Sequence, residues 1–415
     1  MYERYDKLLN EYLNTWDHYT PSPIPSVFKI RPFYSTKQAI RYFRLKMKLK
    51  QVCEMVRKDK KITPETHTHL MTLVSLWLNI NAKVINQSVI GDYIKTTETF
   101  ITRVQTRWED IDEESIFQAL RNVWIMNAIQ MMAGQPFELT DAMFAYSMLY
   151  PLTDNLMDTL DISMHEKRVF VEKLGQRLRG EQIYSNNRHE SDVFEMVSLI
   201  EFQYPRLKYP EIYESLLQIH KAQVDSLEQQ NSSLSMDTLK YLTFNKGAAS
   251  VVADGYLVLG TLSNEQLDFL IGYGIVLQLA DDLQDMKIDA SVNHSTLFST
   301  QNSLTSKTDT LKKLIYFSSL TLEKIVTQNV KFSTDLKSLL SSSMTLLIGD
   351  AVHEQKEFFS KNILKYIESM QVVSLTQHAN LKKIGKQYFH SGTGQGSIFP
   401  PSPKKDFLIL YRNNN

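Results

Sequence analysis

The chain has 415 residues, of which 43% are hydrophobic and 22% are charged, and this composition excludes an intrinsically disordered or collagen-like chain. Its 46 basic and 46 acidic residues cancel, which removes the electrostatic basis on which nucleic-acid binding usually rests. With only 14 glycines and 12 prolines the sequence is poor in turn residues, and this favours long helices over many short strands.

The N-terminal segment, the absence of a long apolar run and the single cysteine predict a cytoplasmic protein. The N-terminal segment MYERYDKLLNEY is charged from its third residue and lacks the apolar core of a signal peptide. No run of about 18 uninterrupted apolar residues occurs, so no membrane-spanning helix is expected. Cys53 alone can form neither an intramolecular disulfide nor a cysteine metal cluster, which fits a reducing compartment.

Proline placement predicts the domain organisation. Residues 1–35 are expected to form an N-terminal helix followed by a proline-rich connector, and residues 391–415 a tail rich in glycine and proline. No proline occurs between Pro210 and Pro400, as stacked helices allow and a sandwich of short strands rarely does. Since no linker divides residues 36–390, we expect one large all-α domain there.

The first acidic cluster lies in the stretch SMLYPLTDNLMDTLDIS. Asp154 and Asp158 are four residues apart and so share one face of a helix. Pro151 removes a backbone donor just before them and is expected to kink the helix near the carboxylates. Tyr146 and Tyr150 precede Asp154 by two turns and one, which makes them candidates for lining a cavity, although core packing is the more common fate of such side chains. A carboxylate pair with this spacing also occurs on solvent-exposed faces.

A lysine and two glycines stand out between and within the acidic segments. Lys246 opens an apolar helix of small residues, TFNKGAASVVADGYLVLG, where it could reach a phosphate as a point charge or simply extend into solvent from a helix end. Gly247 can let the backbone bend or approach closely, and Gly274 leaves room either for a long substrate chain in a cavity or for close packing between helices.

The strongest feature is the second acidic cluster, in GYGIVLQLADDLQDMKID. Asp281 and Asp285 lie on one helix face with Gln278, and Asp282 is rotated by about one hundred degrees toward the flank. Carboxylates clustered at the end of an apolar helix repel each other and lose hydration. A divalent cation bound to the carboxylates offsets this repulsion. Mg²⁺ prefers oxygen ligands of this kind, and substrate phosphates typically complete its coordination. The alternative is a solvated acidic face. Two such helices could face one another across a cavity in a bundle.

These motifs resemble those of a known family. QLADDLQD resembles the second aspartate-rich motif of trans-isoprenyl diphosphate synthases, and DNLMD resembles a degenerate first motif, with Asn155 where elongating synthases usually carry aspartate. Lys246 and Gly247 stand where that family has a Lys-Thr pair that touches diphosphate. The order and the spacings also agree from roughly residue 141 to residue 298. The chain is therefore similar to members of the class I isoprenoid synthase superfamily, which includes class I terpene synthases.

The departures from the family pattern narrow the expected reaction. Elongating synthases usually carry Arg-Arg-Gly shortly after the first motif, whereas this chain has Lys167, Arg168 and, later, Arg177 and Arg179. The Gly-Lys that commonly follows the second motif is absent as well. These losses weaken the case for two-substrate chain elongation. The stretch LQLADDLQDMKID, which ends at Asp289, is also similar to the second motif of squalene and phytoene synthases.

The resemblance implies a helical bundle around a central apolar cavity and a set of site residues. Metal ligands for Mg²⁺ would be Asp154, Asp158, Asp281 and Asp285, and Asp282 would complete the catalytic carboxylates. Diphosphate would be bound by Lys246, Gln278 and one or more of Arg168, Arg177 and Arg179. Tyr146, Tyr150, Gly247 and Gly274 would line the cavity.

The function that the resemblance implies is that of a Mg²⁺-dependent terpene synthase, which ionises and cyclises a prenyl diphosphate. One alternative is a prenyltransferase, acting by chain elongation or by head-to-head condensation. A second alternative, of a different class, is a non-catalytic helical subunit that binds a partner. The resemblance also implies a homodimer, although no residue pattern shows one, and neither nucleic acid nor a spanning membrane segment is expected.

Overall fold

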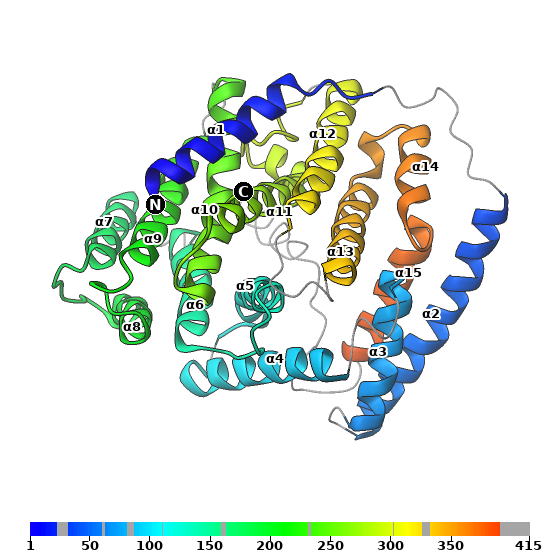
Figure 1. The fold of residues 1–415 in the computed structure, drawn as a ribbon, viewed down its shortest axis with the longest axis horizontal. Helices are drawn as coiled ribbons and strands as arrows, with labels where there is room; N and C mark the ends of the chain where they lie inside the picture. Colours follow the sequence, from blue (N-terminus) through cyan, green and yellow to red (C-terminus); the bar gives the residue numbers. More distant parts are fainter. Residues whose placement is uncertain are drawn as a thin grey trace.

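The computed structural model describes residues 1–22, 32–59, 63–80, 87–109, 111–158, 163–230, 234–301, 303–325 and 333–390. Within these ranges all regular structure is helical, and the predicted all-α class is confirmed (Figure 1). The helices are α1 (Tyr2–His18), α2 (Pro32–Asp59), α3 (Pro64–Leu78), α4 (Gln87–Arg107), α5 (Glu113–Met132), α6 (Asp141–Asp158), α7 (Met164–Arg179), α8 (Arg188–Gln203), α9 (Pro210–Ser226), η1 (Leu227–Gln230), α10 (Met236–Leu259), α11 (Asn264–Ser291), α12 (Leu304–Glu323), α13 (Ser333–Glu354), η2 (Lys356–Phe358), α14 (Lys361–Met370) and α15 (Leu375–His390).

The long helices α10 and α11 form the centre of the bundle. They make the most extensive contact of any helix pair in the described chain, and α10 also packs on α9, α5, α6 and α1, while α11 packs on α12 and α13. In Figure 1 both lie inside a ring of other helices. Most residues of α10 and of the N-terminal two thirds of α11 are buried. A helix that is apolar around most of its surface belongs in a core, and these two hold the motifs identified in the sequence.

Local sequence signals set where the central helices begin. The Ser263 hydroxyl accepts a hydrogen bond from the backbone of Gln266, whose side chain in turn accepts one from the Ser263 backbone, so α11 starts with a capping box. Ser235 caps α10 and Asp112 caps α5 through a single side-chain acceptor each. Because these caps satisfy backbone N–H groups that have no partner within the helix, they define the helix starts that position the site.

The N-terminal helix is part of the main core. The Tyr5 hydroxyl donates to the Asn245 side chain of α10 at 2.9 Å and is fully buried. Trp16 packs edge to face on Phe244 and Phe317, with ring centroids 5.3 and 5.1 Å apart. The predicted helix in residues 1–35 therefore covers α10, α11 and α12. Residues 23–31 of the predicted connector and the whole 391–415 tail lie outside the described residues.

Helices α2, α3 and α15 enclose a smaller hydrophobic core at the right-hand edge of Figure 1. Its fully buried members are Leu45, Leu49, Val52, Cys53, Leu73, Val373 and Leu381. Burial raises the pKa of the Cys53 thiol to about 11, so this cysteine is a packing residue and not a nucleophile at neutral pH.

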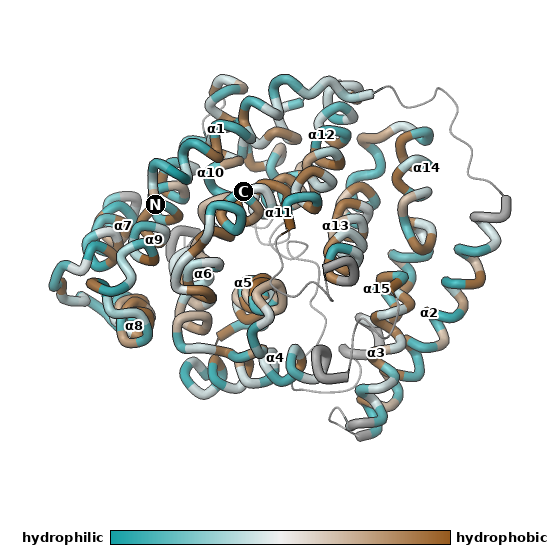
Figure 2. Tube along the Cα trace, viewed as in Figure 1, coloured by the Kyte–Doolittle hydropathy of each residue, from teal (hydrophilic) through white to brown (hydrophobic). Residues whose placement is uncertain are grey.

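Hydrophobic and hydrophilic residues alternate along all of these helices (Figure 2), and no helix of the described residues is long and apolar enough to span a bilayer.

Candidate functional site

The two acidic motifs occupy the ends of two inner helices. Asp154 and Asp158 belong to the last two turns of α6, but their side chains lie outside the described residues, so their approach to α11 stays a prediction. Asp281, Asp282 and Asp285 follow the buried part of α11, at the point where its side chains begin to meet solvent. The capping box at Ser263 and the apolar turns after it carry this end of the helix through the core.

An arginine of α5 pairs with the acidic end of α11 and lies near α6. The Arg121 guanidinium donates to Asp281 at 3.1 Å, with 53% of the Arg121 side chain and 39% of the Asp281 side chain exposed. The Asp281 carboxylate makes the largest contribution to the raised pKa of Arg121, and partial loss of hydration opposes this rise. Tyr150 and Asp285 raise the pKa further. Tyr150 lies in α6 one turn before Asp154. The end of α6 and the acidic end of α11 therefore both lie within electrostatic reach of one guanidinium.

Asp282 differs from its acidic neighbours because it faces the interior. Its side chain is almost fully buried, Gln278 donates to its Oδ1 at 2.8 Å, and its Oδ2 has no hydrogen-bond partner among the described residues. Burial raises the pKa of Asp282 to about 8, aided by Asp281 and Asp289 and opposed by Gln278 and Lys246. At neutral pH Asp282 is therefore mostly a neutral acid. The Gln278 amide, predicted to bind diphosphate, donates to this acid instead.

Two glycines place the predicted lysine beside the acidic motif. A Cβ on Gly247 would lie 2.5 Å from the Gly274 carbonyl oxygen, and one on Gly274 would lie 2.1 Å from the Gly247 oxygen. The backbones of α10 and α11 thus touch at this crossing, which is the packing alternative for these glycines, and they leave no space there for a substrate chain. Lys246, next to Gly247, is brought close enough to Asp282 to lower the pKa of its carboxyl.

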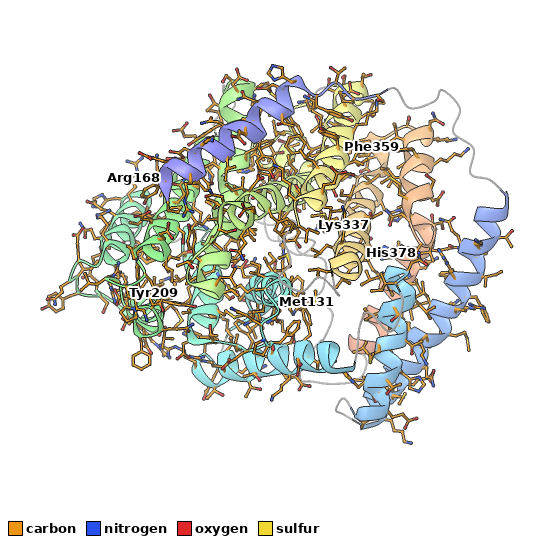
Figure 3. The ribbon with its side chains drawn as sticks, in the orientation of Figure 1. Met131, Arg168, Tyr209, Lys337, Phe359 and His378 are labelled. Carbon is orange, nitrogen blue, oxygen red and sulfur yellow. The ribbon has the colours of Figure 1, made fainter. Side chains whose placement is uncertain are left out.

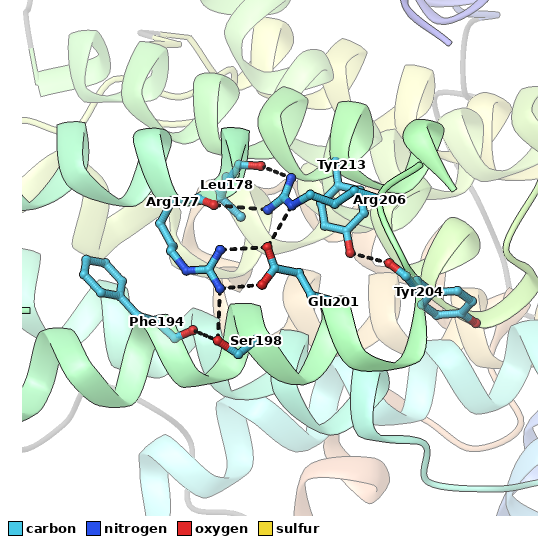
Figure 4. Close-up of polar contacts among 8 residues, drawn as sticks. All are labelled: Arg177, Leu178, Phe194, Ser198, Glu201, Tyr204, Arg206 and Tyr213. Atoms are coloured by element: carbon cyan, nitrogen blue, oxygen red, sulfur yellow. Dashed lines mark hydrogen bonds and ion pairs between the residues drawn. The ribbon is translucent and has the colours of Figure 1, made fainter. Parts of the chain in front are cut away.

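The arginines of α7 are held elsewhere. Arg177 forms a two-pronged ion pair with Glu201 of α8 (Figure 4), and Arg179 pairs with Glu181 at 2.8 Å. Arg168 is exposed, and Figure 3 labels it on α7 at the left of the view, well away from α11 in the centre. Since α7 packs on α8 and α9, the structure does not bring these three side chains to the acidic end of α11.

The two predicted cavity-lining tyrosines have different surroundings. Tyr146 is buried, and its hydroxyl donates to the Ser250 carbonyl of α10 at 3.3 Å, which makes it part of the α6–α10 packing. Tyr150 is only partly buried and lies near Arg121. The side chains that keep solvent exposure on the inner helices here are those of Arg121, Tyr150, Lys246, Gln278, Asp281 and Asp285. Solvent therefore reaches the point where α5, α6, α10 and α11 converge.

Arg121 was not predicted from the sequence. It belongs to no motif, but it is the sole basic residue in α5, EESIFQALRNVWIMNAIQMM, whose acidic residues all lie in the first turn. A lone arginine in the middle of an otherwise apolar or neutral helix needs a partner or solvent, and that requirement is the signal that could have identified it.

The described residues supply part of a divalent-cation site. No three aspartate, glutamate, histidine or cysteine side chains among them lie close enough to hold a metal ion. Asp281 and Asp285 nevertheless present two partly exposed carboxylates on one helix face, and carboxylate oxygens are the ligands that Mg²⁺ prefers. The donor chemistry fits Mg²⁺, with Asp154 and Asp158 as the predicted remaining ligands.

A second buried carboxyl lies deeper along α10. Asp254 is fully buried, and neither of its oxygens has a hydrogen-bond partner in the described chain. Burial raises its pKa well above the ordinary value. Burial also raises the pKa of Tyr146 of α6 and Tyr273 of α11, and the nearby Asp254 adds to both shifts. The interior between α6, α10 and α11 thus holds a neutral acid next to two phenols.

We expect Asp254 to make the stability of the protein depend on pH. Its folded-state pKa lies above the unfolded value near 3.8, so folding takes up a proton and the free energy of unfolding falls as pH rises from about 4. The slope from this group reaches about 1.4 kcal/mol per pH unit. Urea unfolding of Asp254→Asn between about pH 5 and pH 8 should lack this slope.

The control for this experiment is Asp237→Asn, which changes an exposed carboxylate of the same helix and should leave the pH profile as it is in the wild type. Parallel profiles for Asp254→Asn and the wild type would contradict a protonated Asp254 in the folded protein.

Comparison with known proteins leaves the family open. No protein-family model matches the chain, and no curated protein matches it either. A solved structure described as a geranyltransferase from Legionella pneumophila aligns with 67% of this chain and with 100% of its own chain, at 12% identity and a TM-score of 0.35. A similarity of that size defines neither a family nor a function for this chain.

Proposed function

We propose that this protein is a Mg²⁺-dependent class I terpene synthase that ionises and cyclises a prenyl diphosphate. The observation that carries the proposal is the position of Arg121, which pairs with Asp281 of α11 and interacts with Tyr150, one turn before the first motif in α6. The acidic end of α11 and a residue one turn before the first motif thereby lie near the same cation. The resemblance of both motifs to the isoprenoid synthase superfamily supports the same function.

The acidic side chains would hold the metal. Asp281 and Asp285, together with the predicted Asp154 and Asp158, would be the ligands of Mg²⁺. When bound, the metal would neutralise the charge that develops on the diphosphate leaving group. The ion pair between Asp281 and Arg121 does not prevent this, because a pair this exposed contributes at most about 1 kcal/mol and exchanges partners readily.

The remaining residues have separate tasks in the proposed reaction. Lys246 and Arg121 would donate to diphosphate oxygens, since both lie beside the acidic end of α11. An allylic cation must be kept from water, and the side chains of α10 and α11 beyond Lys246 are mostly buried and apolar, with Asp254 and Tyr273 among them. Trp124 follows Arg121 by one turn of α5, and its ring could stabilise a cation by its π face.

The ion pairs and the position of the α7 arginines support cyclisation over chain elongation. Elongation requires a second diphosphate, whose charge needs cations of its own. Arg177 and Arg179 are bonded to Glu201 and Glu181, and Arg168 is exposed on the same distant helix. The described basic side chains beside the acidic motif, Lys246 and Arg121, suit a single diphosphate.

Incubation with defined substrates tests the proposal. The purified protein would be incubated with Mg²⁺ and with geranyl, farnesyl or geranylgeranyl diphosphate, each with and without isopentenyl diphosphate. We expect a hydrocarbon or alcohol in the hexane extract from one diphosphate alone. Longer diphosphates formed only with isopentenyl diphosphate would instead show elongation, and a head-to-head product would show condensation. No product from any combination would favour the non-catalytic subunit.

A further inference from the structure

Helix α2 has an apolar outer face in addition to the one it buries. Its inner face packs into the smaller core through residues such as Leu45 and Leu49. On the other side, Ile40, Phe43 and Met47 are 50%, 64% and 56% exposed. Their spacing of three and four residues places them on one stripe, opposite the buried side chains. No described segment covers this stripe, and α2 lies at the outer edge of the molecule (Figure 1).

The stripe lies in a strongly basic segment. Residues 32–53 contain no acidic residue, and their basic residues are Lys37, Arg41, Arg44, Lys46, Lys48 and Lys50. Because the whole chain has zero net charge, this is a local concentration of positive charge. In Figure 2 teal and brown segments accordingly alternate along α2.

Helical geometry puts cations on both sides of the stripe. At about 100° per residue, Lys46 and Lys50 fall on one flank of Phe43 and Met47, and Arg41 and Arg44 fall on the other flank. None of these four cations forms an ion pair with a carboxylate of the described residues. Lys48 is different, since it turns toward His69 of α3. The outer surface of α2 is therefore an apolar strip between two rows of positive charge that no carboxylate of the described residues pairs with.

We propose that α2 docks the protein on the surface of an anionic lipid bilayer. A helix that lies in a membrane interface has an apolar strip for the boundary between headgroups and acyl chains, flanked by lysine and arginine for the anionic headgroups. The charge of this face is complementary to such a surface. A nucleic acid would satisfy the cations but would leave Ile40, Phe43 and Met47 without an apolar environment, so the apolar strip favours lipid.

Vesicle sedimentation of the full chain tests the proposal. We expect the protein to bind phosphatidylcholine vesicles that contain about one third phosphatidylserine, and to bind pure phosphatidylcholine much less. Raising the salt from about 0.1 M to about 1 M should release most of it, because salt screens the headgroup charge. Vesicle binding is measured without catalytic activity, so its result does not depend on whether the proposed terpene synthase reaction occurs.

Two variants separate the apolar and the charged contributions. Phe43→Ser should lower the partition coefficient on the anionic vesicles about tenfold or more, because it removes an inserted ring. Arg44→Gln combined with Lys50→Gln should lower it by a similar or larger factor and reduce the salt dependence. The matched control is Phe202→Ser in α8, which removes an exposed ring that has Glu201 beside it and should leave binding unchanged.

Phe43, Arg44 and Phe202 are exposed and Lys50 is partly exposed, so circular dichroism spectra and melting temperatures should match those of the wild type. The proposal is overturned if the wild type does not bind the anionic vesicles, or if Phe43→Ser binds them as the wild type does. Binding to heparin that is equal in the wild type and in Phe43→Ser, without vesicle binding, would assign this face to a polyanionic or acidic partner instead.

Discussion

Replacing Asp281 or Asp285 by asparagine is expected to lower kcat/KM for the prenyl diphosphate by about two to three orders of magnitude, which corresponds to about 3 to 4 kcal/mol of transition-state stabilisation. An amide has nearly the same shape as the carboxylate but is neutral, and it is a much poorer ligand for Mg²⁺. The measurement is release of inorganic diphosphate at saturating Mg²⁺. Since both side chains are partly exposed, the helical content should stay that of the wild type.

The matched control is Asp268→Asn, which makes the same chemical change in the N-terminal half of the same helix. Asp268 accepts a 2.8 Å hydrogen bond from Lys324, the residue that follows α12, and is far along α11 from the acidic motif. We expect this variant to keep the activity of the wild type. Near-normal turnover by both Asp281→Asn and Asp285→Asn would show that the α11 carboxylates are not the catalytic site.

Gly274→Ala is expected to destabilise the protein by about 3 kcal/mol or more. The added Cβ would lie 2.1 Å from the Gly247 oxygen and 2.9 Å from the Cα of Ala248, and both are backbone atoms that cannot turn aside. The central helices would have to separate at their crossing, which would also move Lys246 away from Asp282. Urea unfolding followed by circular dichroism measures the loss of stability.

A helical glycine without a described neighbour at its Cβ position provides the control. Gly385 lies within α15, and no atom of the described residues would come within 4 Å of a Cβ added there. Gly385→Ala should stabilise the protein by about 0.5 to 1 kcal/mol, because alanine loses less backbone entropy in a helix. If Gly274→Ala is as stable as Gly385→Ala, α10 and α11 do not meet in backbone contact.

The sequence by itself was sufficient for the all-α class and for the local position of the motifs. Few glycines and prolines, helix-period apolar residues and caps such as Ser263 act over one or a few turns, so they can be recognised along the chain. The same is true of the i, i+4 pair Asp281 and Asp285. For Gly247 and Gly274 the sequence allowed either a cavity or close packing, and only the crossing of two helices decided for packing.

The partners of charged side chains could be known only from the tertiary structure. Arg121, which no motif marks, meets Asp281 because α5 packs beside α10, whereas the predicted Arg177 is bonded to Glu201 because α7 packs on α8. The physical reason is the separation along the chain between the residues that interact. Helix formation and capping depend on neighbours within about four residues, but an ion pair, a buried carboxyl such as Asp254 or the uncovered face of α2 depends on which distant segments the packing brings together.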